Sequence, residues 1–94
     1  MNRNDVLNYL KNNHDKFKKL YEIEKIGLFG SYARDEATDD SDIDIFVEAK
    51  PSFHNIMGIK QHIEDELGKK VDIIRKHKNI NPSLLKRIKR DLIQ

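Results

Sequence analysis

Two stretches decide the fold: residues 25–34, Lys-Ile-Gly-Leu-Phe-Gly-Ser-Tyr-Ala-Arg, and residues 42–47, Asp-Ile-Asp-Ile-Phe-Val. Residues 25–29 are short, apolar and followed by Gly30, a pattern that predicts a buried strand. Residues 42–47 alternate between apolar and acidic side chains at their start, which predicts a second strand. The acidic and polar residues 35–41 show no periodicity, so we expect a loop between the two strands.

A long helix is predicted before the first strand. Apolar residues recur at helical spacing over residues 6–21, and Asn2 or Asn4 is available as the N-cap.

A second long helix is predicted after the strand at residues 42–47. Pro51 and Ser52 suit its start, and Gly68 is placed to end it. Its expected apolar side carries Phe53, Ile56, Met57, Ile63 and Leu67.

Residues 71–74 predict a third short strand, and Asn81-Pro82 introduces a last helix with apolar residues 84, 85, 88 and 92 on one side. Helices and strands therefore alternate along the chain. This order favours one domain over residues 1–94, with a central sheet of about three strands and helices packed against it, in an α/β or α+β arrangement.

Composition limits the classes of function. The 94 residues include 37% hydrophobic and 36% charged side chains, enough for one modest core, and the net charge of +2 does not indicate a nucleic-acid binder. Cysteine is absent and the longest apolar run covers only a few residues. We therefore expect a cytoplasmic protein without disulfides, signal peptide or membrane span.

The Gly30-Ser31 pair is the first candidate for a functional site. Ser31 is expected to cap a short helix that runs to Arg34. A residue without a Cβ beside a hydroxyl and free backbone N–H groups suits the binding of phosphate oxygens. Most Gly-Ser turns are only helix caps, so this pair needs support from its surroundings.

Asp42 and Asp44 supply that support. Alternation along a strand puts both carboxylates on one face, about 6.6 to 6.8 Å apart. Two unpaired carboxylates on one face repel each other, and a Mg²⁺ ion, which prefers carboxylate, water and phosphate oxygens, would remove that repulsion. The alternative is that both acids belong to a solvated acidic run with Asp39 and Asp40.

Asp72 favours the metal-site hypothesis. It interrupts the apolar strand 71–74 and points away from Val71 and Ile73. If this strand neighbours residues 42–47, three carboxylates can converge, as two-metal phosphoryl transfer requires.

Together, Gly30-Ser31, Asp42-Ile43-Asp44 and Asp72 resemble the polymerase-beta-type nucleotidyltransferase superfamily. Residues 28–34 and 41–45 resemble, more narrowly, the minimal nucleotidyltransferases, the antitoxins encoded beside HEPN-domain toxins. The resemblance covers nearly the whole chain.

The resemblance implies an α+β fold with a small central mixed sheet flanked by helices. It also implies that Gly30 and Ser31 hold the triphosphate of ATP. Asp42 and Asp44 would bind two Mg²⁺ ions, and Asp72 would bind a metal ion and act as base toward the acceptor hydroxyl. The implied reaction transfers AMP from ATP to a tyrosine of the partner HEPN ribonuclease. Many relatives have glycine where this chain has Asp35, so the resemblance does not define the path of the following loop.

Some interpretations stay open. Arg34 either neutralises phosphate charge or pairs with a nearby carboxylate. The last helix carries Lys86, Arg87, Lys89 and Arg90, most simply a solvated face, or else a surface for an acidic toxin or RNA. The alternatives to an enzyme are a non-catalytic antitoxin that masks its toxin by contact and, with less support, an RNA-binding accessory domain.

Overall fold

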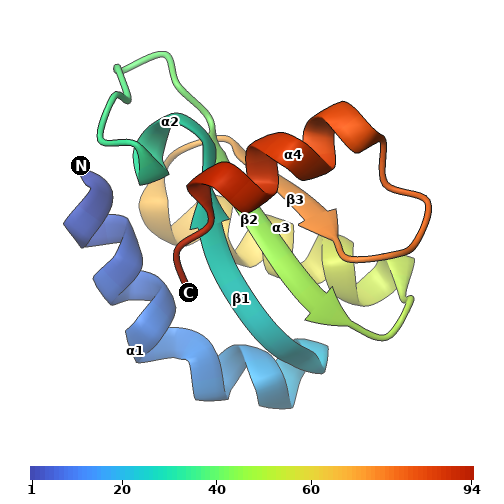
Figure 1. Cartoon of the computed structure of the whole chain (residues 1–94). Helices are drawn as coiled ribbons and strands as arrows, with labels where there is room; N and C mark the ends of the chain where they lie inside the picture. Colours follow the sequence, from blue (N-terminus) through green and yellow to red (C-terminus); the bar gives the residue numbers. More distant parts are fainter.

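The computed structural model describes all residues, 1–94, and contains four helices and three strands in the predicted order (Figure 1). The helices are α1 (Arg3–Tyr21), α2 (Gly30–Ala33), α3 (Phe53–Leu67) and α4 (Pro82–Asp91). The strands are β1 (Ile23–Phe29), β2 (Ile43–Ala49) and β3 (Val71–Arg75). None of the helices is long and apolar enough to cross a membrane.

The sheet is mixed, as the family resemblance implies. β2 lies in the centre, pairs antiparallel with β1 on one side and parallel with β3 on the other. The register places Asp44 opposite Asp72 across the parallel pair and opposite Phe29 across the antiparallel pair. The end of β1 and the starts of β2 and β3 therefore meet at one end of the sheet.

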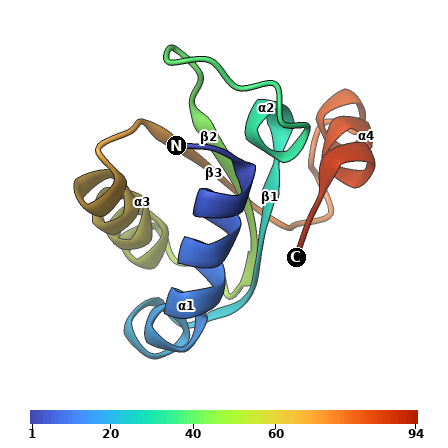
Figure 2. The same cartoon turned by 90° about the vertical axis from the view of Figure 1, so that its left-hand side faces the viewer.

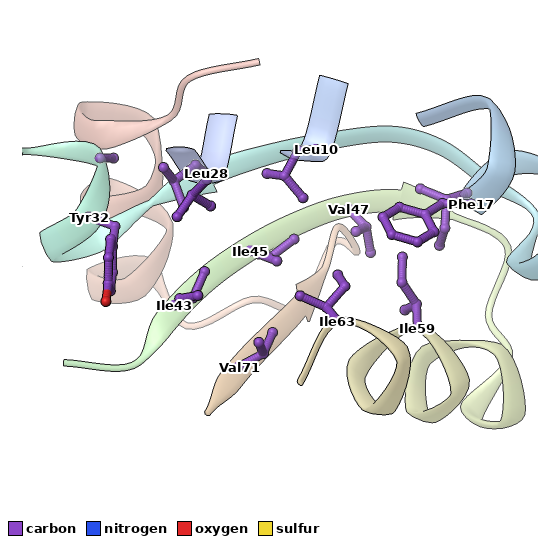
Figure 3. Close-up of a cluster of buried hydrophobic side chains, with 13 residues drawn as sticks. Leu10, Phe17, Leu28, Tyr32, Ile43, Ile45, Val47, Ile59, Ile63 and Val71 are labelled. Atoms are coloured by element: carbon purple, nitrogen blue, oxygen red, sulfur yellow. The ribbon is translucent and has the colours of Figure 1, made fainter. Parts of the chain in front are cut away.

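One face of the sheet carries the main core, under α1 and α3 (Figures 2 and 3). Ile43, Ile45 and Val47 point from the central strand into this core and are completely buried. Phe17 of α1 and Ile63 of α3 meet them there. Each such side chain contributes about 1.5 to 3 kcal/mol through burial, so the alternation in β2 fixes which face holds these helices.

The other face is covered in part by α4 (Figure 2). Phe29, Phe46, Ile80 and Ile88 form a second, smaller buried cluster between α4 and the sheet. After α4, the chain returns to β1, where Leu28 and Ile93 exchange two backbone hydrogen bonds of 2.8 and 2.9 Å. These contacts hold α4 beside the end of the sheet where Asp44 and Asp72 lie.

The helix ends match most of the predicted signals. Asn2, rather than Asn4, caps α1 in a capping box with Asp5, and Ser52 caps α3. Gly68 ends α3 with a positive φ of 66°, as predicted.

The apolar side predicted for α3 is partly wrong. Phe53 and Met57 are 82% and 43% exposed, whereas Ile59 and Ile63 are completely buried. Ile59 lies four residues before Ile63, on the stripe that faces the sheet, and Phe53 and Met57 lie on one flank of the helix. The sequence shows where apolar residues recur but not which part of a broad apolar stripe a small sheet can cover.

The departure at Asp35 has a structural answer. Its backbone has a φ of 60°, in the left-handed region that glycine adopts most easily. Aspartate is one of the few other residues that enter this region routinely. The turn after α2 is therefore made with Asp35 in the conformation that glycine would supply.

Candidate active site

Gly30 joins β1 to α2 and lies directly against Asp44. Its φ is 76°, and a Cβ at this position would lie 2.1 Å from Oδ2 of Asp44. Any side chain here would therefore clash with the carboxylate and would also strain the backbone. The glycine is needed so that the Asp44 carboxylate can approach the first turn of α2.

Ser31 does not cap α2, contrary to the prediction. The helix begins two residues earlier than predicted, at Gly30, and Phe29 occupies the N-cap position without a side-chain hydrogen bond. The left-handed φ of Gly30 starts the turn early and leaves Ser31 inside it. Because the Ser31 hydroxyl has no role as a cap, it is available to a ligand in the cavity that it lines.

Asp44 and Asp72 come together as predicted. They are register partners on adjacent parallel strands, Asp44 partly buried and Asp72 exposed. Asp42 precedes β2 and does not line the same cavity as the other two. No group of three or more Asp, Glu, His or Cys side chains is close enough together to hold a metal ion as the side chains stand. The structure thus assembles a carboxylate pair, with the third acid near its margin.

The electrostatic state of Asp44 reflects this crowding. The pKa of Asp44 is raised to about 6, first by burial and then by the charges of Asp72 and Asp42, against weaker opposing effects of Arg87 and Arg34. A half-buried carboxylate with two acidic neighbours lacks positive charge. Hard oxygen donors in such a setting fit Mg²⁺, which uses one or two carboxylates together with water and phosphate oxygens.

A cavity of about 570 Å³ opens in front of this pair. Phe29 to Ser31, Asp44 and Asp72 lie at one end of it. Residues 56, 57 and 60 of α3 and residues 84, 87 and 91 of α4 form two of its walls. The volume lies within the range of small-molecule sites, about 300 to 1,000 Å³.

Arg34 lines the cavity, but its guanidinium is already paired. Nη1 donates to Asp91 Oδ2 at 2.7 Å, and Nε donates to Glu36 Oε2 at 3.1 Å. Asp91 also accepts two hydrogen bonds from Arg90, and its side chain is only 3% exposed. Of the two interpretations of Arg34, the structure shows the pairing with carboxylates, which ties α2 to α4 at the mouth of the cavity.

Arg87 is the residue that the sequence interpretation missed. It lines the cavity and makes no ion pair, whereas the other two cations there, Arg34 and Lys60, are bound to Asp91 and Glu64. Its charge reaches Asp44, whose pKa it lowers. In the sequence Arg87 was one of four basic residues on the last helix, and only its position one residue before Ile88, which packs against the sheet, could have distinguished it.

The chain is similar to known proteins over most of its length. Residues 5–93 match the family model described as "Polymerase beta, Nucleotidyltransferase". A Methanocaldococcus jannaschii protein provisionally named a protein adenylyltransferase is 41% identical over 93 residues, which cover 95% of this chain and 93% of that protein.

Two solved structures share the fold. One, provisionally assigned as a minimal nucleotidyltransferase, has a TM-score of 0.80 and 25% identity, and the match covers 100% of this chain and 96% of that one. The other, a toxin–antitoxin crystal structure with AMP-PNP, has a TM-score of 0.66 and 26% identity, with coverage of 100% and 72%.

Proposed function

Because the chain belongs to the polymerase beta nucleotidyltransferase family, we propose that it transfers AMP from ATP to a tyrosine hydroxyl of a cognate HEPN ribonuclease toxin, and so acts as its antitoxin. The family resemblance drawn from the sequence motifs is confirmed by the match over residues 5–93. One observation carries the proposal: the Asp44–Asp72 pair stands beside Gly30-Ser31 in one cavity.

Asp44 and Asp72 would hold Mg²⁺, with Asp42 as a further ligand. The bound ions would stabilise the negative charge that develops on the phosphate oxygens and on the departing pyrophosphate. The carboxylates are suited to this role because Asp44 is flanked by two other acids and pairs with no cation. Their mutual repulsion is the reason that a divalent cation should bind tightly there.

The proposed reaction forms one bond and breaks one. The tyrosine oxygen attacks the α-phosphorus of ATP, and the bond from that phosphorus to the bridging oxygen of the β-phosphate breaks, so pyrophosphate leaves. Asp72 is the more exposed carboxylate of the pair and so the one that an acceptor can reach; we assign it the proton of the tyrosine hydroxyl.

The triphosphate would lie between α2 and α4. The Gly30 backbone and the free Ser31 hydroxyl offer donors on one side, and Arg87 offers an unpaired guanidinium on the other. A guanidinium that is not held by a carboxylate can give its full donor set to phosphate oxygens. Arg34 would contribute at most partially, since Asp91 and Glu36 already hold it.

The partner and the nucleotide are supported from outside the chain. A structural relative at 26% identity is an antitoxin or toxin component crystallised with AMP-PNP, an ATP analogue. The M. jannaschii relative carries the name of a protein adenylyltransferase, which describes AMP transfer to protein. Both support AMP transfer from ATP to a protein in a toxin–antitoxin pair.

Mass spectrometry of the cognate HEPN toxin tests the proposal. The toxin should gain one or more AMP units when it is produced together with this protein, and tandem spectra should place them on tyrosine. Coexpression with the Asp44→Asn, Asp72→Asn double variant should leave the toxin unmodified. A tight complex in which the toxin is never modified would overturn the transferase and would instead favour inhibition by contact.

A further inference from the structure

The outer edge of β3 presents unpaired backbone groups beside the catalytic carboxylates. In the parallel ladder, the N–H of Ile43 donates to the carbonyl of Lys70 and the N–H of Lys76 donates to the carbonyl of Val47. Residues in such a strand alternate, so 70, 72, 74 and 76 face β2. Ile73 therefore directs both its N–H and its C=O outward, away from β2.

The first outward donor on this edge is already satisfied by a side chain. The N–H of Val71 donates to Glu64 Oε2 of α3 at 2.9 Å. Two residues further on, Ile73 has no corresponding partner: no backbone or side-chain hydrogen bond outside the β2–β3 ladder involves it. On this edge, therefore, the N–H of Val71 has a hydrogen-bond partner, whereas the N–H and C=O of Ile73 have none.

Two helices border this open edge. On one side, Phe53 and Met57 lie on the flank of α3 that also carries Glu64, and they are 82% and 43% exposed. On the other side are Leu84 and Arg87 of α4, which line the same cavity as Met57 and Ile73. Phe53 and Met57 lie one helical turn apart on α3, so together they give an exposed apolar surface next to the cavity, and such patches are typical of interaction sites.

We propose that an extended segment of the partner protein docks along the outer edge of β3 as an added strand, and that this segment carries the acceptor tyrosine. The inference rests on the proposed function for its acceptor. The groove is continuous with the reacting groups, because Ile73 follows Asp72 directly and Asp72 adjoins Asp44. A segment that is hydrogen-bonded to the backbone of Ile73 therefore passes directly beside Asp72.

The spacing of a sheet makes the geometry specific. An added strand lies about 4.8 Å from β3, and its residue opposite Asp72 has its Cβ about 5 Å away, on the same face. A tyrosine at that position is long enough to extend over Asp72 toward Asp44. The docked segment would thus deliver the hydroxyl across the sheet face instead of from open solvent.

An extended polypeptide fits these features better than the nucleobase of ATP. An outward N–H and C=O on the same residue, two residues beyond the Val71 N–H that Glu64 already binds, match the repeat of a partner strand. A base could stack on Phe53 but would use neither backbone group. Docking of a strand uses both the backbone of Ile73 and the exposed apolar flank of α3.

Amide exchange measured by NMR tests the docking without any catalysis. In the free protein the Ile73 amide should exchange rapidly, and Ile74, bonded in the ladder, slowly. In the complex with the cognate HEPN toxin, Ile73 should become protected by at least about tenfold. Unchanged exchange of Ile73 in the complex would overturn the docking. Protection without AMP transfer would support the docking and refute only the proposed reaction.

Kinetics of AMP transfer give a second test. The Phe53→Ser, Met57→Ser double variant should raise KM for the toxin by about tenfold, the loss expected of a small apolar anchor, and leave KM for ATP within about twofold. Leu20→Ser is the matched control, since Leu20 is an exposed apolar residue on α1, 57% accessible. A change in KM for ATP alone would identify the nucleobase as the occupant of this flank and overturn the inference.

Discussion

Asp44 and Asp91 line the same cavity in opposite electrostatic conditions. Asp91 is buried and accepts hydrogen bonds from Arg90 and Arg34, which lower its pKa. Asp44 is half-buried, has Asp72 as its neighbour, and its pKa is raised to about 6. One carboxylate is neutralised by the protein itself, and the other is not.

The contrast between Asp44 and Asp91 arises because the fold places Arg34 and Arg90 against Asp91 and not against Asp44. Arg34 is close enough to affect Asp44 but is bonded to Asp91, where it joins α2 to α4. The acids at this end of the sheet and Arg87 therefore have no ion-pair partner within the chain, and under the proposed function they bind an external cation and an external anion. A site that binds a metal ion and a polyphosphate together needs this separation, because internal ion pairs would compete with both ligands.

The largest effect should come from neutralising the uncompensated acid. Asp44→Asn should lower AMP transfer by at least about a thousandfold, equivalent to about 4 kcal/mol of transition-state stabilisation. Urea denaturation at neutral pH should show no loss of stability, since an unfavourable charge is removed. Asp39→Asn, in the exposed loop, is the control and should retain full activity. An active Asp44→Asn enzyme would remove the basis of the contrast.

Removing the compensated acid should act on folding instead. Asp91→Ala deletes three hydrogen bonds, of 2.7, 2.8 and 3.2 Å, and should lower the free energy of unfolding by about 2 kcal/mol. Because both arginines are partly exposed, the loss should be less than that of a fully buried ion pair. Asp91→Asn keeps the size of the side chain and should lose less. Equal stability of the alanine variant and the unmodified protein would show that Arg34 is not tied down by Asp91.

Substitution of Arg87 tests whether the unpaired cation in the cavity binds phosphate. Arg87→Gln should raise KM for ATP by about tenfold, or about 1.4 kcal/mol, because one charge-assisted contact to phosphate is lost. Lys86→Gln removes a neighbouring positive charge on α4 that does not line the cavity, and should leave KM for ATP unchanged. If both substitutions raise KM equally, the effect is one of general charge and not of the position of Arg87.

The smallest expected effect is on the pH dependence of stability, which should differ in direction between Asp44 and Asp91. Since the folded-state pKa of Asp44 is raised from 3.8 to about 6, its contribution favours folding below about pH 4 and is lost as pH rises to 6. The pKa of Asp91 is lowered, so its contribution is present above its unfolded value and lost in acid.

For Asp44 the free energy of unfolding should fall by only about 1 kcal/mol over this pH range, because water screens the charge of a half-exposed group. Without Mg²⁺, the urea midpoint of Asp44→Asn should therefore exceed that of the unmodified protein by an amount that grows as the pH rises from 4 to 7. Parallel pH profiles for Asp44→Asn and the unmodified protein would contradict the raised pKa.

Much of the site was predictable because its signals are local. The strand at residues 42–47 follows from alternation, and this alternation also fixed the face of Asp44 once Ile43 and Ile45 were assigned to the core. Asp72 was predictable as an acid inside an apolar strand. The mixed sheet and the family followed from the resemblance of the motifs, and both are confirmed.

The remaining features could not be predicted because they depend on contacts between distant segments. Ser31 lost its role as a cap because Gly30 turns early against Asp44. Arg34 is held by Asp91, 57 residues further along the chain. Phe53 and Met57 are exposed because the sheet has only three strands and covers just one part of the α3 surface.

The sequence by itself therefore determined the elements, the acids on β2 and β3 and the glycine that makes room for them. Only the tertiary structure decided which basic residue pairs with which acid. It pairs Arg34 with Asp91 and leaves Arg87 without an ion pair in the cavity. The physical reason is that alternation and turn preference act over a few neighbouring residues. Pairing of charges, in contrast, is set by the position of one helix relative to another, which no local pattern records.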